Sequence, residues 1–335
     1  MDLDVVGIGS PLVDVLATTS EEGISRSGLT RGSMMLVDAL RAEEIYGSMG
    51  PATEVSGGSA ANTMAGVAAL GGSAAFVGKV ADDVLGRVFT HDIRSTGVQF
   101  DPVPVPVPVS GDGTSPGTGR CLVLVTDDGE RTMATHLGVA ITLAPGDVPE
   151  PLVQRGRIVY LEGYLWDLPP AKDALRHAAD VAHRHDGSVA LSLSDSFCVE
   201  RHQREFLDLL VDRGDVLFGN GQEIVRLFGA RSLDLGVEAA EETGLLVAVT
   251  LGDRGAVVTT PRGPVEVPAF PVDDVVDTTG AGDLFAAGFL FGLTHGADPE
   301  RCAQLGALCA SEVIGHLGAR PQEDLRDLAS RAGLL

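Results

Sequence analysis

A seven-residue run near the C-terminal end of the chain combines the groups that phosphoryl transfer needs. Asp277-Thr278-Thr279-Gly280-Ala281-Gly282-Asp283 precedes an apolar segment that begins at Leu284 and is predicted to form a buried helix. A helix start carries unpaired N–H groups and partial positive charge, which suits a phosphate. Its small residues let phosphate oxygens approach the backbone, and Asp283 could accept the proton of an attacking hydroxyl. The alternative is an ordinary helix start with an acidic residue favoured by the dipole.

This run resembles the second signature of the PfkB carbohydrate-kinase family, D-T-x-G-A-G-D, without a departure. The first signature of that family is matched by Ser56-Gly57-Gly58-Ser59-Ala60-Ala61-Asn62-Thr63. The resemblance covers nearly the whole chain. It implies a ribokinase-like α/β fold and an ATP-dependent kinase that phosphorylates a hydroxyl of a nucleoside or sugar. The backbone N–H groups of Gly280, Ala281 and Gly282 would then stabilise charge on the transferring phosphate.

The resemblance also implies the residues that hold the acceptor. Family members use the Gly57-Gly58 turn and Asn62 to approach substrate hydroxyls, because glycine allows close backbone access and an amide both donates and accepts. Asp14, in Gly9-Ser10-Pro11-Leu12-Val13-Asp14, matches a family Asp that binds two hydroxyls of a sugar or ribose. Read alone, a Gly-Gly turn is more often just a turn, and Asp14 would be a solvated carboxylate.

ATP and its metal ion are the next expectation from the resemblance. Asn220-Gly221-Gln222-Glu223 matches the family's N-x-x-E motif, whose Glu helps hold Mg²⁺-bound water. The stretch from Thr250 to Gly255 resembles T-x-G-x-x-G, which borders the ATP phosphates. Family members often bind a monovalent cation such as K⁺ between the loop before Gly280 and Gly318-Ala319-Arg320-Pro321. These matches assign ATP contacts to Asn220, Thr250, Gly252, Gly255 and Thr278, Mg²⁺ to Glu223, and K⁺ to Asp277 and Thr279.

Within the family, the chain looks most like bacterial adenosine kinases and adenosine kinase-like sugar kinases. In adenosine kinases an Arg of a mobile lid contacts the transferring phosphate, and Arg131 is the matching position; the alternative is a solvated hairpin arginine. His136 stands where relatives often have Tyr, and Ala140 replaces a polar residue. The likeness to adenosine kinases makes adenosine the first acceptor to consider. A sugar such as ribose or fructose is the alternative, and a non-catalytic nucleoside sensor is the alternative from another class.

The elements that must position these groups alternate along the chain. Buried strands are predicted at 5–8, 74–77, 158–161, 189–193, 216–218 and 245–250, and helices at 60–70, 82–95, 171–185, 201–211 and 223–228. This rhythm predicts a central, mainly parallel sheet with helices on both faces. We expect a single ribokinase-like domain over residues 1–335.

Two regions break the rhythm and predict a small β-sheet lid. They cover about residues 11–38 and 98–137. In the second region, the run from Val103 to Pro108 alternates Val with Pro and cannot be a central strand, because each Pro lacks a donor. Residues 120–126 and 131–135 read as a hairpin that turns at Asp127-Asp128-Gly129-Glu130. A simple edge extension of the main sheet is the alternative.

Composition limits the partners. The 335 residues carry a net charge of −23, which argues against nucleic acid and anionic lipid as partners. Cys121, Cys198, Cys302 and Cys309 form no C-x-x-C pair. The pattern predicts reduced thiols in a cytoplasmic protein. No apolar run reaches the length of a membrane span. We expect a monomer or homodimer whose partners are the acceptor and ATP.

Other enzyme motifs are missing or incomplete. Leu12 stands where a dinucleotide-binding G-x-G-x-x-G would place its third glycine, and Pro11 would obstruct the helix start. No G-x-x-x-x-G-K-[ST] or H-E-x-x-H is present. The segment from Ser194 to Cys198 lacks the G-x-S-x-G elbow of a hydrolase and reads better as a loop that lines the nucleotide pocket.

Overall fold

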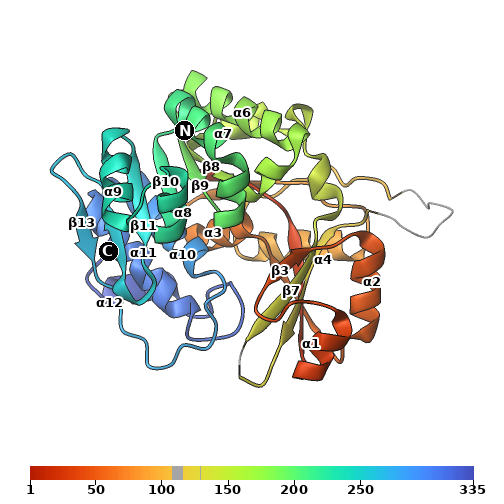
Figure 1. Ribbon diagram of the computed structural model, residues 1–335. Helices are drawn as coiled ribbons and strands as arrows, with labels where there is room; N and C mark the ends of the chain where they lie inside the picture. Colours follow the sequence, from red (N-terminus) through yellow and green to blue (C-terminus); the bar gives the residue numbers. More distant parts are fainter. Residues whose placement is uncertain (108–115, 129) are drawn as a thin grey trace.

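The structure is a computed structural model that describes residues 1–107, 116–128 and 130–335. Pro108 of the Val-Pro run and Gly129 of the predicted hairpin turn lie outside the described residues. Within the described ranges the strands form a large sheet and a small sheet. Figure 1 shows the small sheet, with its helices α1 and α2, at one side of the larger body.

The large sheet follows the predicted alternation of buried strands and helices. The strand order is β13 (Val265–Val267), β12 (Ala256–Val258), β11 (Leu246–Thr250), β10 (Val216–Asn220), β9 (Ser188–Ser192), β8 (Gly156–Glu162), β1 (Leu3–Ile8) and β5 (Ala74–Val77). Neighbouring strands from β11 to β5 are parallel, whereas β12 is antiparallel to both β11 and β13. The predicted α/β fold is confirmed.

Helices cover both faces of the large sheet, because neighbouring strand residues point to opposite sides. Ile158 and Tyr160 pack in one apolar core, and Val159 and Leu161 pack in the other. The first face is covered by α3 (Ser59–Ala69), α4 (Val84–Ser95), α10 (Ala281–Thr294), α11 (Pro299–Val313) and α12 (Leu325–Arg331). The second is covered by α5 (Glu150–Val153), α6 (Pro169–Arg184), α7 (Ser196–Arg213), α8 (Gly221–Leu227) and α9 (Leu233–Glu242).

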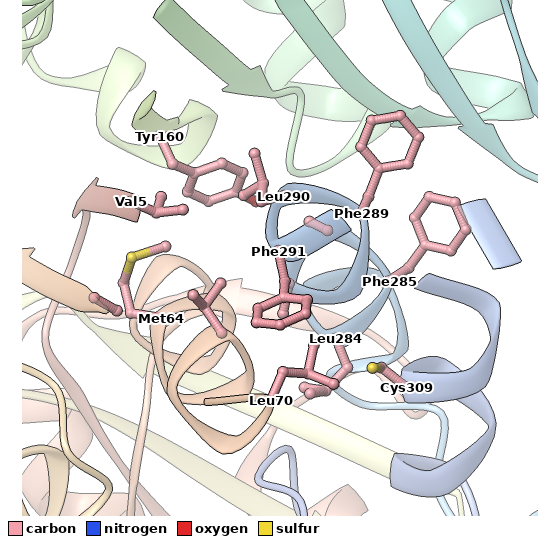
Figure 2. Packing of buried hydrophobic residues seen from close by; sticks show 14 of the residues in the cluster. Val5, Met64, Leu70, Tyr160, Leu284, Phe285, Phe289, Leu290, Phe291 and Cys309 are labelled. Atoms are coloured by element: carbon pink, nitrogen blue, oxygen red, sulfur yellow. The ribbon is translucent and has the colours of Figure 1, made fainter. Parts of the chain in front are cut away.

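Helix α10 is central to the first core. It is apolar nearly all round, and its residues 284–292 are buried. Figure 2 shows its Leu290 beside Tyr160 of β8, with Met64 of α3 at the left of the view. A helix buried on this scale has little freedom to shift, so its N-terminus is held firmly at the edge of the sheet.

The small sheet has the order β3 (Met34–Leu36), β7 (Arg131–His136), β6 (Gly119–Val125), β2 (Leu12–Thr18) and β4 (Thr53–Gly57). Its outer face packs against α1 (Glu21–Ser27) and α2 (Ala39–Ser48) through a separate apolar cluster that includes Ile24, Ile45 and Leu122. The β6–β7 pair is the predicted hairpin, with antiparallel register.

The small sheet differs from the sequence prediction in two places. Strand β4 lies outside residues 11–38 and 98–137, and it pairs with β2. Phe100, predicted to belong to the lid, packs in the main core, where its ring lies 5.5 Å from Phe76 and 5.4 Å from Phe89 between centroids. Val105 forms a short parallel bridge with Ala81 rather than a strand.

Short 3-10 helices complete the described chain, at η1 (Gly138–Thr142), η2 (Pro145–Asp147), η3 (Gly163–Asp167) and η4 (Gly252–Arg254). All four cysteines are buried free thiols. No helix in the described ranges is both long enough and apolar enough to cross a bilayer.

Candidate active site

A cavity of about 440 Å³ lies between the two sheets. One wall is the carboxyl edge of the large sheet, where the parallel strands β8, β9, β10 and β11 all end, and such an edge is the usual ligand site of an open α/β sheet. The opposite wall is the inner face of the small sheet. The predicted site residues that line the cavity come from both walls and from the start of α10: Asp14, Gly58, Asn62, Arg131, Asn220, Glu223, Thr250, Thr279, Gly280, Gly282 and Asp283.

Asp283 lies in the first turn of α10 and faces the cavity. Ser59 Oγ donates to its Oδ1 at 2.6 Å, and Asn62 Nδ2 donates to its Oδ2 at 3.0 Å. Burial raises the pKa of Asp283 to about 6, against the lowering effect of these two donors and of the Arg320 charge. The carboxylate therefore has a fixed orientation and a proton affinity suited to accepting a proton near neutral pH. Ser59 was not predicted as a site residue.

The backbone ahead of α10 forms only part of the predicted anion cradle. Gly280 has φ +82°, and a Cβ there would lie 2.6 Å from Ala319 Cβ, so both conformation and space require glycine. Among the described residues, no acceptor binds the N–H groups of Gly280 and Gly282. Ala281 N–H, in contrast, donates to Thr278 O at 3.3 Å. Of the three N–H groups predicted to face the phosphate, two therefore have no acceptor within the described residues, and that of Ala281 has one.

Arg131 connects the small sheet to the loop before α10. Its guanidinium forms an ion pair with Asp277, whose side chain is 2% exposed, and its Nη1 donates to Thr279 Oγ1 at 3.0 Å. Asp277 also accepts N–H groups from Thr279 at 3.0 Å and Gly318 at 2.9 Å. A cation thus already lies against the oxygens predicted to bind K⁺, and Asp277 and Thr279 do not fit a K⁺ ion in this arrangement.

Asp14 lies on β2, on the inner face of the small sheet. A Cβ at Gly57 would lie 2.4 Å from Asp14 Oδ2, and a Cβ at Gly58 would lie 2.3 Å from Ser10 O. The glycine pair is therefore what lets the turn approach this carboxylate. Burial raises the pKa of Asp14 to about 6, and the charges of Arg320 and Arg131 act in the opposite direction. Gly57 itself lies behind Asp14 and does not line the cavity.

Asn220 and Glu223 form a capping box at the start of α8. Asn220 Oδ1 accepts the N–H of Glu223 at 3.0 Å, and the Glu223 carboxylate accepts Asn220 N–H at 2.9 Å and Nδ2–H at 2.6 Å. Glu223 is buried, which raises its pKa to about 7. Both residues also line the cavity, so the capping role and a ligand role are compatible.

The residues present fit a magnesium ion carried by phosphates. Within the described ranges, no group of three or more His, Cys, Asp or Glu side chains could hold a metal ion by itself. Mg²⁺ keeps several waters and is usually bound through substrate phosphates with one or two carboxylates nearby. Each Glu223 oxygen retains a lone pair beyond its bond to Asn220, which suits contact with such a water.

The other predicted ATP contacts divide into two groups. Thr250 ends β11 and lines the cavity. Gly252, Gly255 and Thr278 do not line it. Gly255 has a packing reason for being glycine, since a Cβ there would lie 2.0 Å from Val267 O. The predicted pocket loop after β9 does reach the cavity, through Ser194 and Asp195.

Glu162 is a cavity residue that the sequence prediction missed. It ends β8, is 1% exposed, and accepts N–H groups from Ser10 at 3.2 Å and Ala60 at 3.0 Å. Burial raises its pKa to about 7. The carboxylate thus joins the loop after β1 to the start of α3. A glutamate directly after a buried strand was the available signal.

The inner face of the small sheet is largely apolar. Strand alternation directs Met133 and Thr135 of β7 into the cavity and His136 away from it, where His136 Nδ1 lies 3.2 Å from Val37 O. His136 therefore does not face the cavity. The apolar lining of this wall consists of Leu12, Met34, Leu36, Val123, Met133 and Leu137.

Comparison with known proteins gives one consistent family. The profile of the pfkB family carbohydrate kinases matches residues 32–325. The chain is 31% identical over 284 residues to an ATP-dependent ribose-1-phosphate kinase of Halopiger xanaduensis, which covers 85% of this chain and 88% of that protein.

Two solved structures are similar over essentially the full chain. An adenosine kinase from Sinorhizobium meliloti is 47% identical with a TM-score of 0.92, covering 99% of this chain and 100% of the other. A probable sugar kinase from Rhizobium etli is 43% identical with a TM-score of 0.93, covering 100% and 99%. The relatives' names thus agree on a kinase and differ in the acceptor.

Proposed function

The chain belongs to the pfkB family of carbohydrate kinases, which use ATP to phosphorylate a hydroxyl group, and on that premise we propose that it converts adenosine to AMP. The observation that carries this proposal is the composition of the two cavity walls. A nucleoside needs polar groups for its ribose and an apolar surface for its planar base. Asp14 and Asn62 offer the first, and the apolar face of the small sheet offers the second.

The relatives support the same acceptor without deciding it. The Sinorhizobium meliloti protein, 47% identical, is named an adenosine kinase, whereas a ribose-1-phosphate kinase is 31% identical. A phosphorylated acceptor would need a cation of its own. Of the two arginines that line the cavity within the described residues, Arg201 is paired with Asp167, and Arg131, paired with Asp277, is proposed to contact the transferring phosphate. This leaves no uncommitted arginine in that lining for a phosphate on the acceptor, which favours an uncharged acceptor.

In the proposed reaction, Asp283 accepts the proton of the acceptor hydroxyl while the oxygen of that hydroxyl attacks the γ-phosphorus in line. The bond from the γ-phosphorus to ADP breaks, and ADP leaves with that electron pair. The free N–H groups of Gly280 and Gly282 donate to the oxygens of the transferring group, where charge must be stabilised. Ser59 and Asn62 hold Asp283 in the orientation this proton transfer requires.

In this proposal the small sheet acts as a lid over the cavity. The whole chain then works as one catalytic domain. Arg131 would pass from Asp277 to the transferring phosphate as the nucleotide binds, because a phosphate oxygen offers it a second anionic partner. Mg²⁺, when bound through the nucleotide phosphates near Glu223, supplies charge neutralisation. Lid closure would exclude water and so limit ATP hydrolysis.

An acceptor screen tests the assignment. Purified protein with ATP and Mg²⁺ would be offered adenosine, guanosine, ribose, fructose and ribose-1-phosphate, with ADP release as the readout. We expect adenosine to give the highest kcat/KM. A higher kcat/KM for a free sugar would show that the acceptor is that sugar and not adenosine. Tight adenosine binding without ADP release from any acceptor would favour a nucleoside sensor instead.

A further inference from the structure

The short segment Gly318–Arg320, which follows α11, contacts three separate parts of the cavity. Gly318 N–H donates to Asp277 Oδ2 at 2.9 Å. Ala319 packs on Gly280 so closely that a Cβ there would clash. Arg320 extends to the Gly57-Gly58 turn, where it contacts Ser56 and Ala61. The sequence matched this segment to the family's closing pattern and gave Arg320 no role of its own.

Arg320 binds both ends of the Gly57-Gly58 turn. Its Nε donates to Ser56 O at 3.3 Å and its Nη2 to Ser56 Oγ at 3.4 Å, at the end of β4. Its Nη1 donates to Ala61 O at 3.2 Å, in the first turn of α3. The planar guanidinium therefore spans the turn from both sides, and a lysine could not reproduce this geometry. The same first turn of α3 carries Ser59 and Asn62, which hold Asp283.

The charge of Arg320 is not neutralised by an adjacent carboxylate. Within the described ranges, no Asp or Glu oxygen lies within 4.0 Å of its guanidinium. Asp14 and Asp283 are the first two carboxylates that stabilise its charge through space, ahead of Asp92. Burial lowers the pKa of Arg320 to about 10, so it still carries its proton at neutral pH.

We propose that Arg320 is a positioning residue for the kinase reaction: its three hydrogen bonds fix the Gly57-Gly58 turn and the first turn of α3, and its positive charge favours the ionised forms of both Asp14 and Asp283. The inference deepens the proposed function and rests on it. Arg131 is the other cation near Asp14, but it forms its ion pair with Asp277. Of Arg131 and Arg320, it is Arg320 whose charge lowers the pKa of both Asp14 and Asp283.

Several titratable groups lie around the two carboxylates. Asp283 is faced by Tyr160 and Glu162 of β8, Tyr164 of η3, and Asp14 across the cavity. Asp14 is faced by Cys121 of β6, Arg131 of β7, Asp277 and Asp283. Burial favours the protonated form of both carboxylates, and the charges of Asp283 and Asp277 favour it further for Asp14. Loss of Arg320 would raise both pKa values further above 6.

The test compares pH profiles of three variants with the full-length wild-type enzyme, using adenosine and Mg-ATP. For Arg320→Met, we expect the acid limb of kcat/KM to move to higher pH by about half a unit or more, and the KM for the acceptor to rise about tenfold. Arg320→Lys keeps the positive charge but loses the planar guanidinium that binds both ends of the turn. The acid limb of kcat/KM should therefore stay near its wild-type pH, while the KM for the acceptor is still raised. Arg94→Met is the matched control, because Arg94 also donates to a backbone carbonyl, that of Phe100 at 2.7 Å, and does not line the cavity.

Each outcome decides the inference. A folded Arg320→Met enzyme with lower kcat and an unmoved acid limb overturns the counter-charge role. If Arg320→Met does not fold, Arg320→Lys decides: a displaced limb or a wild-type KM contradicts the proposal. Failure of the wild-type enzyme to phosphorylate adenosine would instead refute the proposed acceptor, and the profiles would then use the acceptor that the screen identifies.

Discussion

Asp283 and Asp14 stand on opposite walls of one cavity and share a property, since burial raises the pKa of each to about 6. Their hydrogen bonding differs. Asp283 accepts two side-chain donors from α3, whereas no donor within the described ranges is hydrogen-bonded to the Asp14 carboxylate. Asp283 lies on a helix that is buried in the main core, and Asp14 on a sheet with its own small core.

The difference separates a group prepared for chemistry from a group prepared for binding. A carboxylate held by two donors keeps its orientation before the substrate arrives, which is what proton transfer in a transition state requires. A buried carboxylate with unused lone pairs is unfavourable until a ligand supplies donors, so it contributes to affinity when a diol binds. Three substitutions would break or sharpen this contrast.

The largest effect is expected from Asp283→Asn. The amide keeps the shape and can still accept from Ser59, but it cannot take up a proton from the acceptor hydroxyl. We expect kcat to fall by about 10²–10⁴ with the KM for the acceptor nearly unchanged. Steady-state kinetics with adenosine and Mg-ATP, and calorimetric binding of adenosine, would measure the two parts separately. Near-normal turnover would refute Asp283 as the base.

Asp14→Asn should affect mainly KM, whereas Asp283→Asn affects mainly kcat. An amide presents one acceptor where the carboxylate presents two, so a charged hydrogen bond to the acceptor diol is lost. We expect the KM for adenosine to rise by roughly ten- to a hundredfold, with a smaller change in kcat. Asp173→Asn, which neutralises an exposed carboxylate paired with Arg176, is the control. A loss confined to kcat would show that Asp14 has been assigned the wrong role.

Short motifs let the sequence predict much of this site. Gly57, Gly58 and Gly280 stand in short runs that also contain Asn62 or Asp283, so the spacing within each run carries information. The groups that the three glycines make room for, namely Asp14, Ser10 and Ala319, are distant in the sequence. The alternation of strands and helices was enough to predict the six parallel strands of the large sheet, which are mostly buried on both faces. The antiparallel strands β12 and β13 were not predicted, because each has only three residues and Glu266 of β13 is exposed.

The contacts that the sequence did not predict join distant parts of the chain. Ser59 and Asp283 are 224 residues apart, and Arg320 lies 264 residues from Ser56. Nothing local marks Ser59 as different from any other serine near a helix start. Strand β4 was missed for a related reason: its Thr53 and Glu54 are exposed, so it lacks the apolar run of a buried strand.

Ser59→Ala is expected to give the smallest effect and tests whether the donors on Asp283 matter. The Ser59 hydroxyl stabilises the ionised carboxylate, so its removal should raise the pKa of Asp283 above about 6. In the wild type, activity should fall as the pH drops through about 6, because the protonated acid cannot act as a base. In the variant this acid limb should move to higher pH by about half a unit, with kcat reduced about tenfold on the plateau.

The variant should therefore lose a larger share of activity at acid pH than at alkaline pH, which a pH profile of kcat measures directly. Ser48→Ala, which removes a helix hydroxyl bonded to Ile45 O in the small-sheet layer, provides the comparison. An unmoved limb in Ser59→Ala would mean that burial alone sets the proton affinity of Asp283. The contrast with Asp14 would then lie in their positions on the two walls and not in their hydrogen bonds.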